Sequence, residues 1–439
     1  MSTDESAVFP VEAVRGRFPA LARAPGFVFF DNAAGAQVPQ AVFDAVNTHL
    51  LEHNVQRGGR YRQSREVDAM IARARTALAG FVNARRPEEI AFGMNATSFI
   101  RLISLAVGQG LASRDEIVVT ELDHEANVAT WLALERTGAR LRWWPPRADG
   151  VLHAADLAPL LSGRTRLVAC TLASNALGSI TDVRAAARLA HAAGAELFLD
   201  AVHYAPHAPL DVQALECDYL VCSGYKIFAP HMGFMWGRYE SLQALPTFRE
   251  EFIPDEPPGK IEAGTFVFEN VAGMAAAVGY LGALGQALPG PLAPGRSGAS
   301  GQDVRAAMNA IRVYERSLSR ELLRVFADCG ARVYGLTEES RLDERVPTFA
   351  FNLPGVAPRA VTEAAAHAEI AIRDGHMYTP RLMRRLGLDV EAGLVRVSLV
   401  HYNTRAEIDR LAQVLRDLSR GRAGERPAAG ADPARPARS

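Results

Sequence analysis

The sequence of 439 residues has almost no lysine. Only Lys226 and Lys260 occur among 48 basic residues, and all the others are arginines. Replacement of surface lysines by arginine is typical of GC-rich genomes, so the general scarcity needs no chemical explanation. Arginine stays protonated, whereas lysine can become a neutral amine nucleophile. A lysine retained in such a chain is therefore a candidate for a position that arginine cannot fill.

Cysteine is also scarce, and the charges are balanced. The four cysteines, Cys170, Cys217, Cys222 and Cys329, form no CxxC pair, which argues against a disulfide framework and a zinc knuckle. With 48 basic and 49 acidic residues the net charge is −1, which gives no support for nucleic-acid binding. We expect a reduced, cytoplasmic protein of the size of an enzyme.

Nothing in the sequence is typical of a signal peptide or a membrane span. Residues 1–21 carry acidic residues and no apolar core. The stretch 270–295 has no charge, but it is rich in alanine and glycine and contains Gln286, Pro289 and Pro291. Membrane helices are richer in large apolar residues. We interpret the stretch as a buried or interface helix followed by a loop.

The chain does contain an alternation of β-branched runs and alanine-rich amphipathic stretches. Helices are expected at 66–82 and 183–193. The expected strands are 88–93, 115–122, 139–145, 165–172, 195–202 and 217–224. The alternation predicts an α/β fold with a mainly parallel sheet. Ligands of such sheets bind at the carboxyl ends of the strands.

The later part of the chain predicts a smaller α+β domain. Its expected elements are helices at 302–328, 358–368 and 404–419 and strands at 331–335, 347–353, 369–373 and 394–400. The expected organisation is an N-terminal segment (1–30) packed on the small domain, a large domain (31–285), a loop rich in Pro, Gly and Ser (286–302), the small domain (303–420) and a disordered tail (421–439).

Three polar residues lie in or near the ends of these strands. Asp200 ends the run ELFLD, Lys226 follows the run YLVCSG, and Arg396 lies in LVRVSLVHYNT. Pyridoxal phosphate (PLP) chemistry needs a lysine that forms a Schiff base, a carboxylate that keeps the pyridine nitrogen protonated, and an arginine that holds the substrate carboxylate. Taken singly, each residue also suits a helix cap or an ion pair.

The order and local sequence of these residues resemble a known family. From Phe29 to about Thr404 the chain resembles the cysteine desulfurase-like branch of the class V aminotransferases, which are fold-type-I PLP enzymes. The matching pieces are FFDNAAGAQVPQ (29–40), NATS (95–98), ELDHEANVATW (121–131), ASNALGS (173–179), DAVHYAPH (200–207), SGYK (223–226), EAGT (262–265), RDGHMYTP (373–380) and RVSLVHYNT (396–404). The resemblance implies a large PLP-binding domain, a smaller C-terminal domain, and a homodimer whose active sites share residues.

The resemblance also implies roles around the cofactor ring. It makes Lys226 the Schiff-base lysine, places Asp200 at the pyridine nitrogen, stacks His124 on the ring and puts Asn175 at the phenolic oxygen. Arg396 matches the arginine that binds the carboxylate of a small amino-acid substrate. From the residues alone, a lone histidine such as His124 is more often a core or capping residue.

The phosphate of the cofactor would bind at a helix N-terminus. The resemblance assigns it to the turn at Ala96 and Thr97, where free amides and the helix dipole favour an anion. Ser223 would join them, and Thr265 would reach over from the partner subunit. The ordinary alternative for Thr97 and Ser98 is a helix cap.

The chain departs from the family at the loop that matters most for chemistry. Cysteine desulfurases carry a nucleophilic cysteine where this chain has Tyr378, and no cysteine lies between 330 and 439. A sulfur-accepting step needs a thiolate, which tyrosine cannot supply. We therefore do not expect desulfuration through a loop persulfide.

The cofactor pocket departs from the family as well. His203 stands where many relatives have Gln, Tyr225 where a phosphate-binding His is common, and Ala96 where a Thr would donate a hydroxyl. His203 would be close enough to the phenolic oxygen to tune the cofactor. These changes indicate a distinct sub-branch that keeps its lysine, aspartate and arginine.

Two further features receive ordinary interpretations. His203 and His207 have a spacing that suits a metal, but Pro206 interrupts the segment and no carboxylate or cysteine completes a set, so we expect no metal. Lys260 lies in PDEPPGKIEAG, and we expect it to be exposed to solvent.

Three functions remain open. The first is a PLP-dependent β-elimination of C–S lyase type on a cysteine derivative, in which Tyr378 and His376 bind the substrate, protonate the leaving group or close the site. The second is transamination or epimerisation. The third is a non-catalytic PLP-fold partner protein in sulfur transfer, which the loss of the loop cysteine favours and the retention of Lys226 disfavours.

Overall fold

The computed structural model describes residues 9–262, 264–288 and 300–424. The loop expected at 286–302 and the tail expected from 421 therefore lie largely outside the described residues. The last helix, α15 (Arg405–Gly424), continues a few residues beyond the expected start of that tail.

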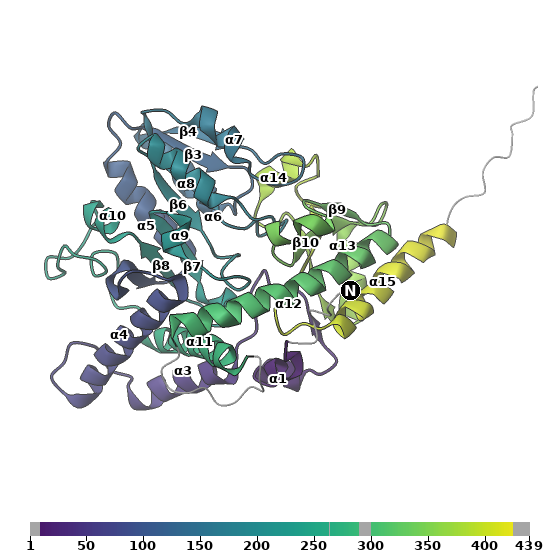
Figure 1. The fold of residues 1–439 in the computed structure, drawn as a ribbon, viewed down its shortest axis with the longest axis horizontal. Coiled ribbons are helices and arrows are strands. Elements are labelled where there is room, and N and C mark those ends of the chain that lie inside the picture. The colour runs from purple at the N-terminus through teal and green to yellow at the C-terminus, as the bar shows by residue number, and fades with distance from the viewer. Residues whose placement is uncertain (1–8, 263, 289–299, 425–439) are drawn as a thin grey trace, which may run out of the picture.

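A seven-stranded sheet forms the centre of the large domain (Figure 1). Its order is β2-β8-β7-β6-β5-β3-β4. The strands are β2 (Ile90–Gly93), β3 (Glu116–Thr120), β4 (Arg140–Trp144), β5 (Thr165–Thr171), β6 (Glu196–Asp200), β7 (Tyr219–Ser223) and β8 (Gly233–Gly237). The strands from β3 to β7 pair in parallel, which confirms the expected α/β fold.

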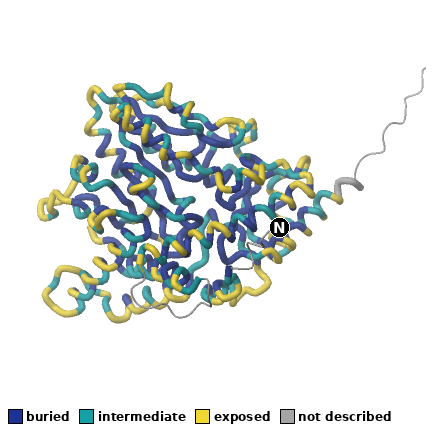
Figure 2. The backbone as a smooth tube through the Cα atoms, in the orientation of Figure 1, coloured by how far each residue is buried: buried dark blue, intermediate teal, exposed yellow. Residues whose placement is uncertain are grey.

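The inner strands are apolar on both faces because helices cover both. Along β6, Leu197 and Leu199 pack into one hydrophobic cluster and Phe198 into another. Successive side chains of a strand point to opposite faces, so the two clusters lie on opposite sides of the sheet. Figure 2 shows the resulting buried strands. The helices of this domain are α3 (Gln40–Glu52), α4 (Arg62–Val82), α5 (Ala96–Gln109), α6 (Ala126–Leu132), α7 (Ala154–Leu157), α8 (Val183–Ala192), α9 (Val212–Leu215), α10 (Tyr239–Ala244) and α11 (Phe268–Ala287).

One strand of this sheet has no clear sequence signal. β8 has the sequence GFMWG and pairs antiparallel with both β7 and β2. Its two glycines have low strand propensity, so the sequence pattern misses it. The glycines are needed for space: a Cβ on Gly233 would lie 2.6 Å from the backbone carbon of Asn95. Tertiary packing therefore decides the conformation of this segment.

The small domain is built on an antiparallel sheet of order β12-β13-β10-β9. Its strands are β9 (Arg332–Tyr334), β10 (Thr348–Asn352), β12 (Arg373–Gly375) and β13 (Leu394–Ser398), and its helices include α13 (Pro358–His367), α14 (Pro380–Arg385) and α15. The single strand expected at 369–373 is two: β11 (Ile370–Ala371) pairs instead with β1 (Val28–Phe29). The N-terminal helices are α1 (Val11–Arg15) and α2 (Pro19–Arg23).

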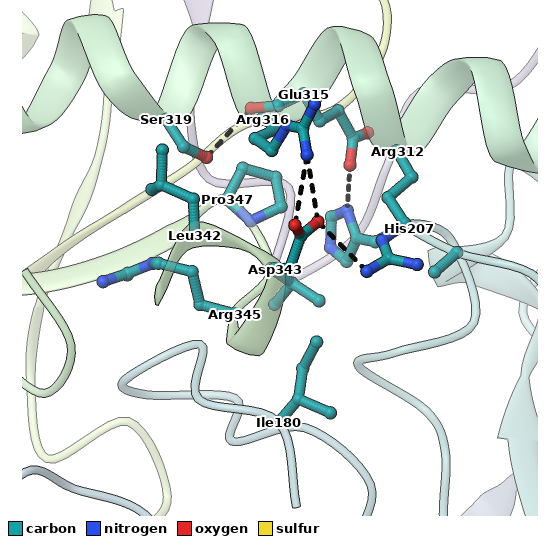
Figure 3. A pocket seen from close by; sticks show the side chains of 12 residues that line it. Ile180, His207, Arg312, Glu315, Arg316, Ser319, Leu342, Asp343, Arg345 and Pro347 are labelled. Atoms are coloured by element: carbon teal, nitrogen blue, oxygen red, sulfur yellow. Dashed lines mark hydrogen bonds and ion pairs between the residues drawn. The ribbon is translucent and has the colours of Figure 1, made fainter. Parts of the chain in front are cut away.

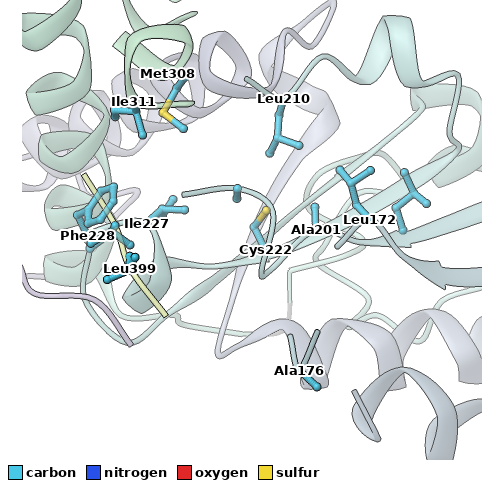
Figure 4. Packing of buried hydrophobic residues seen from close by; sticks show 14 of the residues in the cluster. Leu172, Ala176, Ala201, Leu210, Cys222, Ile227, Phe228, Met308, Ile311 and Leu399 are labelled. Atoms are coloured by element: carbon cyan, nitrogen blue, oxygen red, sulfur yellow. The ribbon is translucent and has the colours of Figure 1, made fainter. Parts of the chain in front are cut away.

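A long helix joins the two domains. α12 (Gly301–Asp328) contacts α11 at one end and α15 at the other (Figure 1). Met308 and Ile311 of α12 pack in the same cluster as Ile227 and Phe228, which directly follow Lys226 (Figure 4). Apolar packing against α12 thus fixes the segment that directly follows this lysine.

The uncharged stretch forms the helix expected there as far as Ala287, whereas the loop expected after it lies largely outside the described residues. α11 lies against α3, α4 and α12, and buried residues occur all around it. A helix that is apolar on all sides is typical of a protein interior. No helix among the described residues is long and apolar enough to cross a membrane.

Candidate active site

The sheet brings the expected lysine and aspartate together at the carboxyl ends of its parallel strands. Asp200 ends β6 and pairs in register with Val221 of the parallel neighbour β7. Ser223 ends β7, and a single 3-10 turn (Gly224–Lys226) then carries Lys226 back into the protein. Both strands therefore deliver their last polar side chains to the same side of the sheet.

Lys226 is buried without a carboxylate in direct contact. It is 8% exposed, and its Nζ donates a hydrogen bond to the carbonyl oxygen of Ala33. Burial and the positive charge of Arg396 lower its pKa to about 7, against the opposing effect of Asp200. A buried amine disfavours its charged form. Lys226 can therefore be a neutral nucleophile near neutral pH.

Asp200 is a buried carboxyl with no cationic hydrogen-bond partner among the described residues. Its Oδ1 accepts a hydrogen bond of 2.9 Å from the amide of Val202. Burial raises its pKa to about 6, although Lys226 acts in the opposite direction. A cation or a protonated ring nitrogen beside it would reverse this shift.

A helix N-terminus lies next to the end of β7. Gly233 pairs with Ser223 on one side, and the backbone of Asn95 and Ala96 packs against it on the other. Asn95 caps α5: its side chain accepts from the amide of Ser98, whose hydroxyl completes the capping box. The cap is thus Asn95, not Thr97. The amides that begin α5 have no intrahelical acceptors and point toward this edge.

Tyr225 has a partner that the sequence did not reveal. Its ring stacks on His231 with centroids 5.0 Å apart and planes 12° apart. The other side of the ring is close to Gly35, where an added Cβ would lie 3.2 Å from Cδ2. The stacked pair therefore lies at the turn that carries Lys226. The spacing of single residues in the sequence does not predict this stacking.

Arg396 belongs to a network that ties both domains together. It is 2% exposed. Its Nη1 donates to the carbonyl oxygen of Asn175 at 2.9 Å, and its Nη2 lies 3.2 Å from Asp31 Oδ1. Asp31 also binds Arg373 at 2.7 Å. Asp31 was missed as a site residue, although FFDNAAG contains it. Asn175 is itself fixed, since its Nδ2 donates to the carbonyl oxygen of Met377 at 2.7 Å.

His124 lies opposite the loop that replaces the cysteine loop. Its ring centroid is 5.3 Å from that of Tyr378, with planes 35° apart. Burial, followed by the charges of Lys226 and Arg396, lowers its pKa to about 4, so it is neutral at pH 7. Its Nδ1 accepts from the amide of Ala126 at 3.1 Å. His124 therefore caps a turn as well as facing the site.

The loop that carries Tyr378 has an unusual backbone. Met377 and Tyr378 have φ of 50° and 59°, in the left-handed region that bulky residues rarely adopt. Tyr378 is 55% exposed. Its carbonyl oxygen accepts from the amide of Glu125 at 2.9 Å, and its own amide donates to His376 Nδ1 at 3.0 Å. Local strain of this kind is concentrated at functional sites.

His203 is buried between the two domains. Its Nε2 lies 2.9 Å from Thr348 Oγ1, and its Nδ1 has no partner among the described residues. Burial, helped by His207, Lys226 and Arg396, lowers its pKa well below the usual value. Among the described residues, no group of three or more His, Cys, Asp or Glu is placed to hold a metal ion.

One expected exposure turns out differently. The prediction that Lys260 is exposed is wrong: it is 4% exposed, with Nζ 2.8 Å from both Asp255 Oδ1 and the carbonyl oxygen of Gln243. Its segment folds back on α10, so the lysine stem is covered. Thr265, expected to reach a partner's site, is exposed in the single chain.

The four cysteines are all free and buried. Burial raises the pKa of every one of these thiols. None is therefore a ready thiolate at neutral pH.

Comparisons with known proteins agree with this geometry. The model of the family "Aminotransferase class-V" matches residues 28–287 and 304–411. The chain therefore belongs to the class V aminotransferases, which are PLP-dependent enzymes of fold type I. Within them it lies in the cysteine desulfurase-like branch, as the following relatives show.

The cysteine desulfurase of Synechococcus elongatus is 35% identical over 434 residues, which are 94% of this chain and 64% of that longer protein. The aminotransferase-like protein FGM3 of Gibberella zeae is 33% identical over 93% of this chain and 98% of its own length. Among solved structures, the apo cysteine desulfurase of Thermococcus onnurineus has a TM-score of 0.83 at 26% identity, covering 94% of this chain and 98% of that one.

Proposed function

We propose that this enzyme uses PLP to catalyse β-elimination on a cysteine derivative, as a C–S lyase without a persulfide cysteine. The observation that carries the proposal is the combination of Tyr378 at the loop apex with four buried thiols. The amino-acid machinery is retained while the sulfur acceptor is absent. The reaction consumes one water and gives pyruvate, ammonia and the protonated sulfur leaving group, which is a thiol from a thioether, hydrogen sulfide from cysteine, a persulfide from cystine and a sulfenic acid from a sulfoxide.

The residues present suit the cofactor. Lys226 can be a neutral amine, Asp200 is a buried carboxyl without a cationic partner, and His203 Nδ1 is an unmatched polar atom beside them. Ser223, Tyr225 and the α5 amides of Ala96 and Thr97 would hold the phosphate, and His124 and Asn175 would contact the ring. When bound, PLP supplies an electron sink for breaking bonds at the α-carbon.

The substrate contacts follow from the chain's own groups. Arg396 presents a buried guanidinium whose Nε has no partner among the described residues, and it would hold the substrate carboxylate. Lys226 would take the α-proton, since its pKa lies near neutrality. Tyr378 and His376 would bind the substrate side chain and protonate the leaving sulfur.

The test is an absorbance spectrum of the purified protein followed by titration with cysteine, cystine and an S-alkyl cysteine sulfoxide. A visible band that Lys226→Ala abolishes and Lys260→Arg retains supports PLP binding. Pyruvate release then supports the lyase. No band even with added PLP would overturn the proposal.

Tyr378 is tested separately. In Tyr378→Phe, loss of the hydroxyl should lower kcat by about 10²-fold if it is the general acid, without change in the cofactor band. Tyr378→Cys installs the thiol that desulfurases use, and it should accumulate protein-bound sulfane sulfur. A wild-type protein that already accumulates such sulfur would contradict the proposal.

Transamination or epimerisation is the second candidate, and its support is the similarity to an aminotransferase-like protein. Conversion of the cofactor to its amine form without pyruvate would favour transamination. A non-catalytic partner in sulfur transfer is the third, which the buried neutral Lys226 argues against.

The assembly is proposed on the same basis. A homodimer would let Thr265 of one chain reach the phosphate of the other, which agrees with its exposure in the single chain. A cytoplasmic location remains a prediction. Mixed dimers of a Thr265→Ala chain and a Lys226→Ala chain would test the sharing. If Thr265 acts in the partner's site, one site of the mixed dimer has both residues intact and the other site lacks both.

A further inference from the structure

A row of buried titratable side chains leads from the candidate active site to α12. The His203 and His207 rings meet edge to face, with centroids 5.5 Å apart and planes 73° apart. His207 Nδ1 lies 2.8 Å from Oε2 of Glu315, in the middle of α12. The side chains of this pair are 4% and 2% exposed. None of the roles proposed for the active site involves this buried carboxyl.

The charge state of this row follows from its surroundings. Burial raises the pKa of Glu315 well above its ordinary value and lowers that of His207 to about 3. The nearest buried bases, His203 and His401, also have lowered pKa values. An uncharged pair avoids the cost of two ions in an apolar core. Glu315 then donates its proton to His207 Nδ1, which leaves the His207 proton on Nε2.

Other charged side chains lie on both sides of this row. Lys226 and Arg396 act on His203 from the active site. Arg312 and Arg316 of α12 bind Asp343 at 3.1 Å on the opposite side. The buried Arg345 lines the same region and donates to the carbonyl oxygens of Leu177 and Thr348. Among the described residues, Glu315 has no ion-pair partner other than His207.

A small cavity adjoins Glu315. It has a volume of about 20 Å³ and is lined by His207, Glu315, Arg312, Arg316 and Asp343 among others (Figure 3). Glu315 Oε1 is buried there and has no partner among the described residues. A polar cavity of this size holds one water molecule, which would satisfy that oxygen.

We propose that Glu315 and His207 are positioning residues for His203: as a neutral, water-completed pair they fix the His203 ring edge-on against Thr348, so that its unpartnered Nδ1 donates a hydrogen bond to the cofactor. This rests on the proposed function, since it needs PLP at the site. It gives a function to the histidine at position 203, where many relatives have Gln, and to Glu315 on α12. The ionised phenolic oxygen of PLP needs hydrogen-bond donors, and a positioned N–H supplies one.

The first test is a pH titration of the bound cofactor's absorbance in wild type, Glu315→Gln and Glu315→Leu. Glutamine can donate to His207 Nδ1 as the neutral acid does, so the Gln variant should keep the wild-type midpoint. Leucine cannot, so the midpoint should rise by about half a pH unit or more. Glu321→Gln, on the same helix and partly exposed, is the matched control and should change nothing.

The second test separates positioning from a general structural role. His203→Gln installs the residue of many relatives, and in that background Glu315→Leu should no longer move the midpoint, because the pathway through His203 is gone. An equal shift in both backgrounds would overturn the proposal. So would a Gln variant as perturbed as the Leu variant, which would indicate an ionised pair.

A readout without cofactor keeps the two proposals distinct. In the apo protein a neutral pair predicts that Glu315→Gln unfolds at the wild-type temperature and Glu315→Leu at a lower one. If wild type binds no PLP, the proposed function fails while this measurement still reports on the pair. If PLP binds but Glu315→Gln is strongly destabilised, only the positioning proposal fails.

Discussion

The two lysines of this chain are both buried, yet their surroundings differ in two respects. Lys260 has Asp255 Oδ1 at 2.8 Å, whereas Lys226 donates to a carbonyl oxygen and faces Arg396. The second arrangement lowers the pKa of Lys226 to about 7. Burial alone therefore does not identify a catalytic lysine. A missing contact with a carboxylate, together with a nearby positive charge, does.

The largest expected difference between the two lysines appears when each is replaced by arginine. Lys226→Arg keeps charge and bulk but cannot form a neutral amine, so turnover should fall by roughly 10⁴-fold or more. Lys260→Arg keeps an ion pair with Asp255 and should retain most activity. Steady-state pyruvate assays on both variants measure this. Equal losses would mean that the two sites were wrongly distinguished.

Arg396 provides the second-largest effect. Arg396→Gln removes both the proposed contact with the substrate carboxylate and the charge that lowers the pKa of Lys226. We expect kcat/KM to fall by about 10²-fold, mainly through KM, and the pKa of Lys226 to rise. The pH profile of cofactor capture by the apo variant should accordingly move to higher pH than in wild type. An unchanged profile would show that Arg396 does not act on Lys226.

The wild-type pH dependence tests the lysine directly. Below about pH 7 Lys226 is protonated and cannot attack PLP, so the capture rate of the apo protein should rise about tenfold per pH unit and level off above pH 7. An ordinary lysine would keep the rate rising toward pH 10. The growth of the visible band after mixing, followed between pH 5.5 and 9.5, distinguishes the two curves.

The smallest effect concerns Lys260. Asp255→Asn removes its carboxylate partner and makes its surroundings resemble those of Lys226. The Asp255 side chain is 59% exposed, so solvent screens the pair and the unfolding temperature should fall by only a few degrees. Thermal unfolding at pH 7 measures this, with Glu240→Gln on the nearby α10 as an exposed control. A large loss would show that the pair is not screened.

Much of the fold and half of the site follow from local sequence. The strand ends at Asp200 and Ser223 are predictable because apolar runs mark both strands. β8 is not, because GFMWG lacks a strand pattern and is held by neighbours on both sides. Asp31 and Glu315 are not either, since each acquires its role from a partner more than 100 positions away: Asp31 from Arg373 and Arg396, Glu315 from His207. The wrong expectation for Lys260 has another cause: its partners Asp255 and Gln243 are near in sequence, but the way the segment packs on α10 leaves no sequence pattern.

The parallel pairing of β1 with β11 has a consequence for how the chain is made. Val28 pairs with Ile370, and Asn32 donates to Asn403 Oδ1 at 3.1 Å. A ribosome delivers the N-terminal partner first and the C-terminal one last. β1 must therefore stay without its partner strand until β11 has been made, and contacts of such sequence separation make folding slow. Because Asp31 lies in this segment, its network with Arg373 and Arg396 forms only after residues more than 300 positions later have been made.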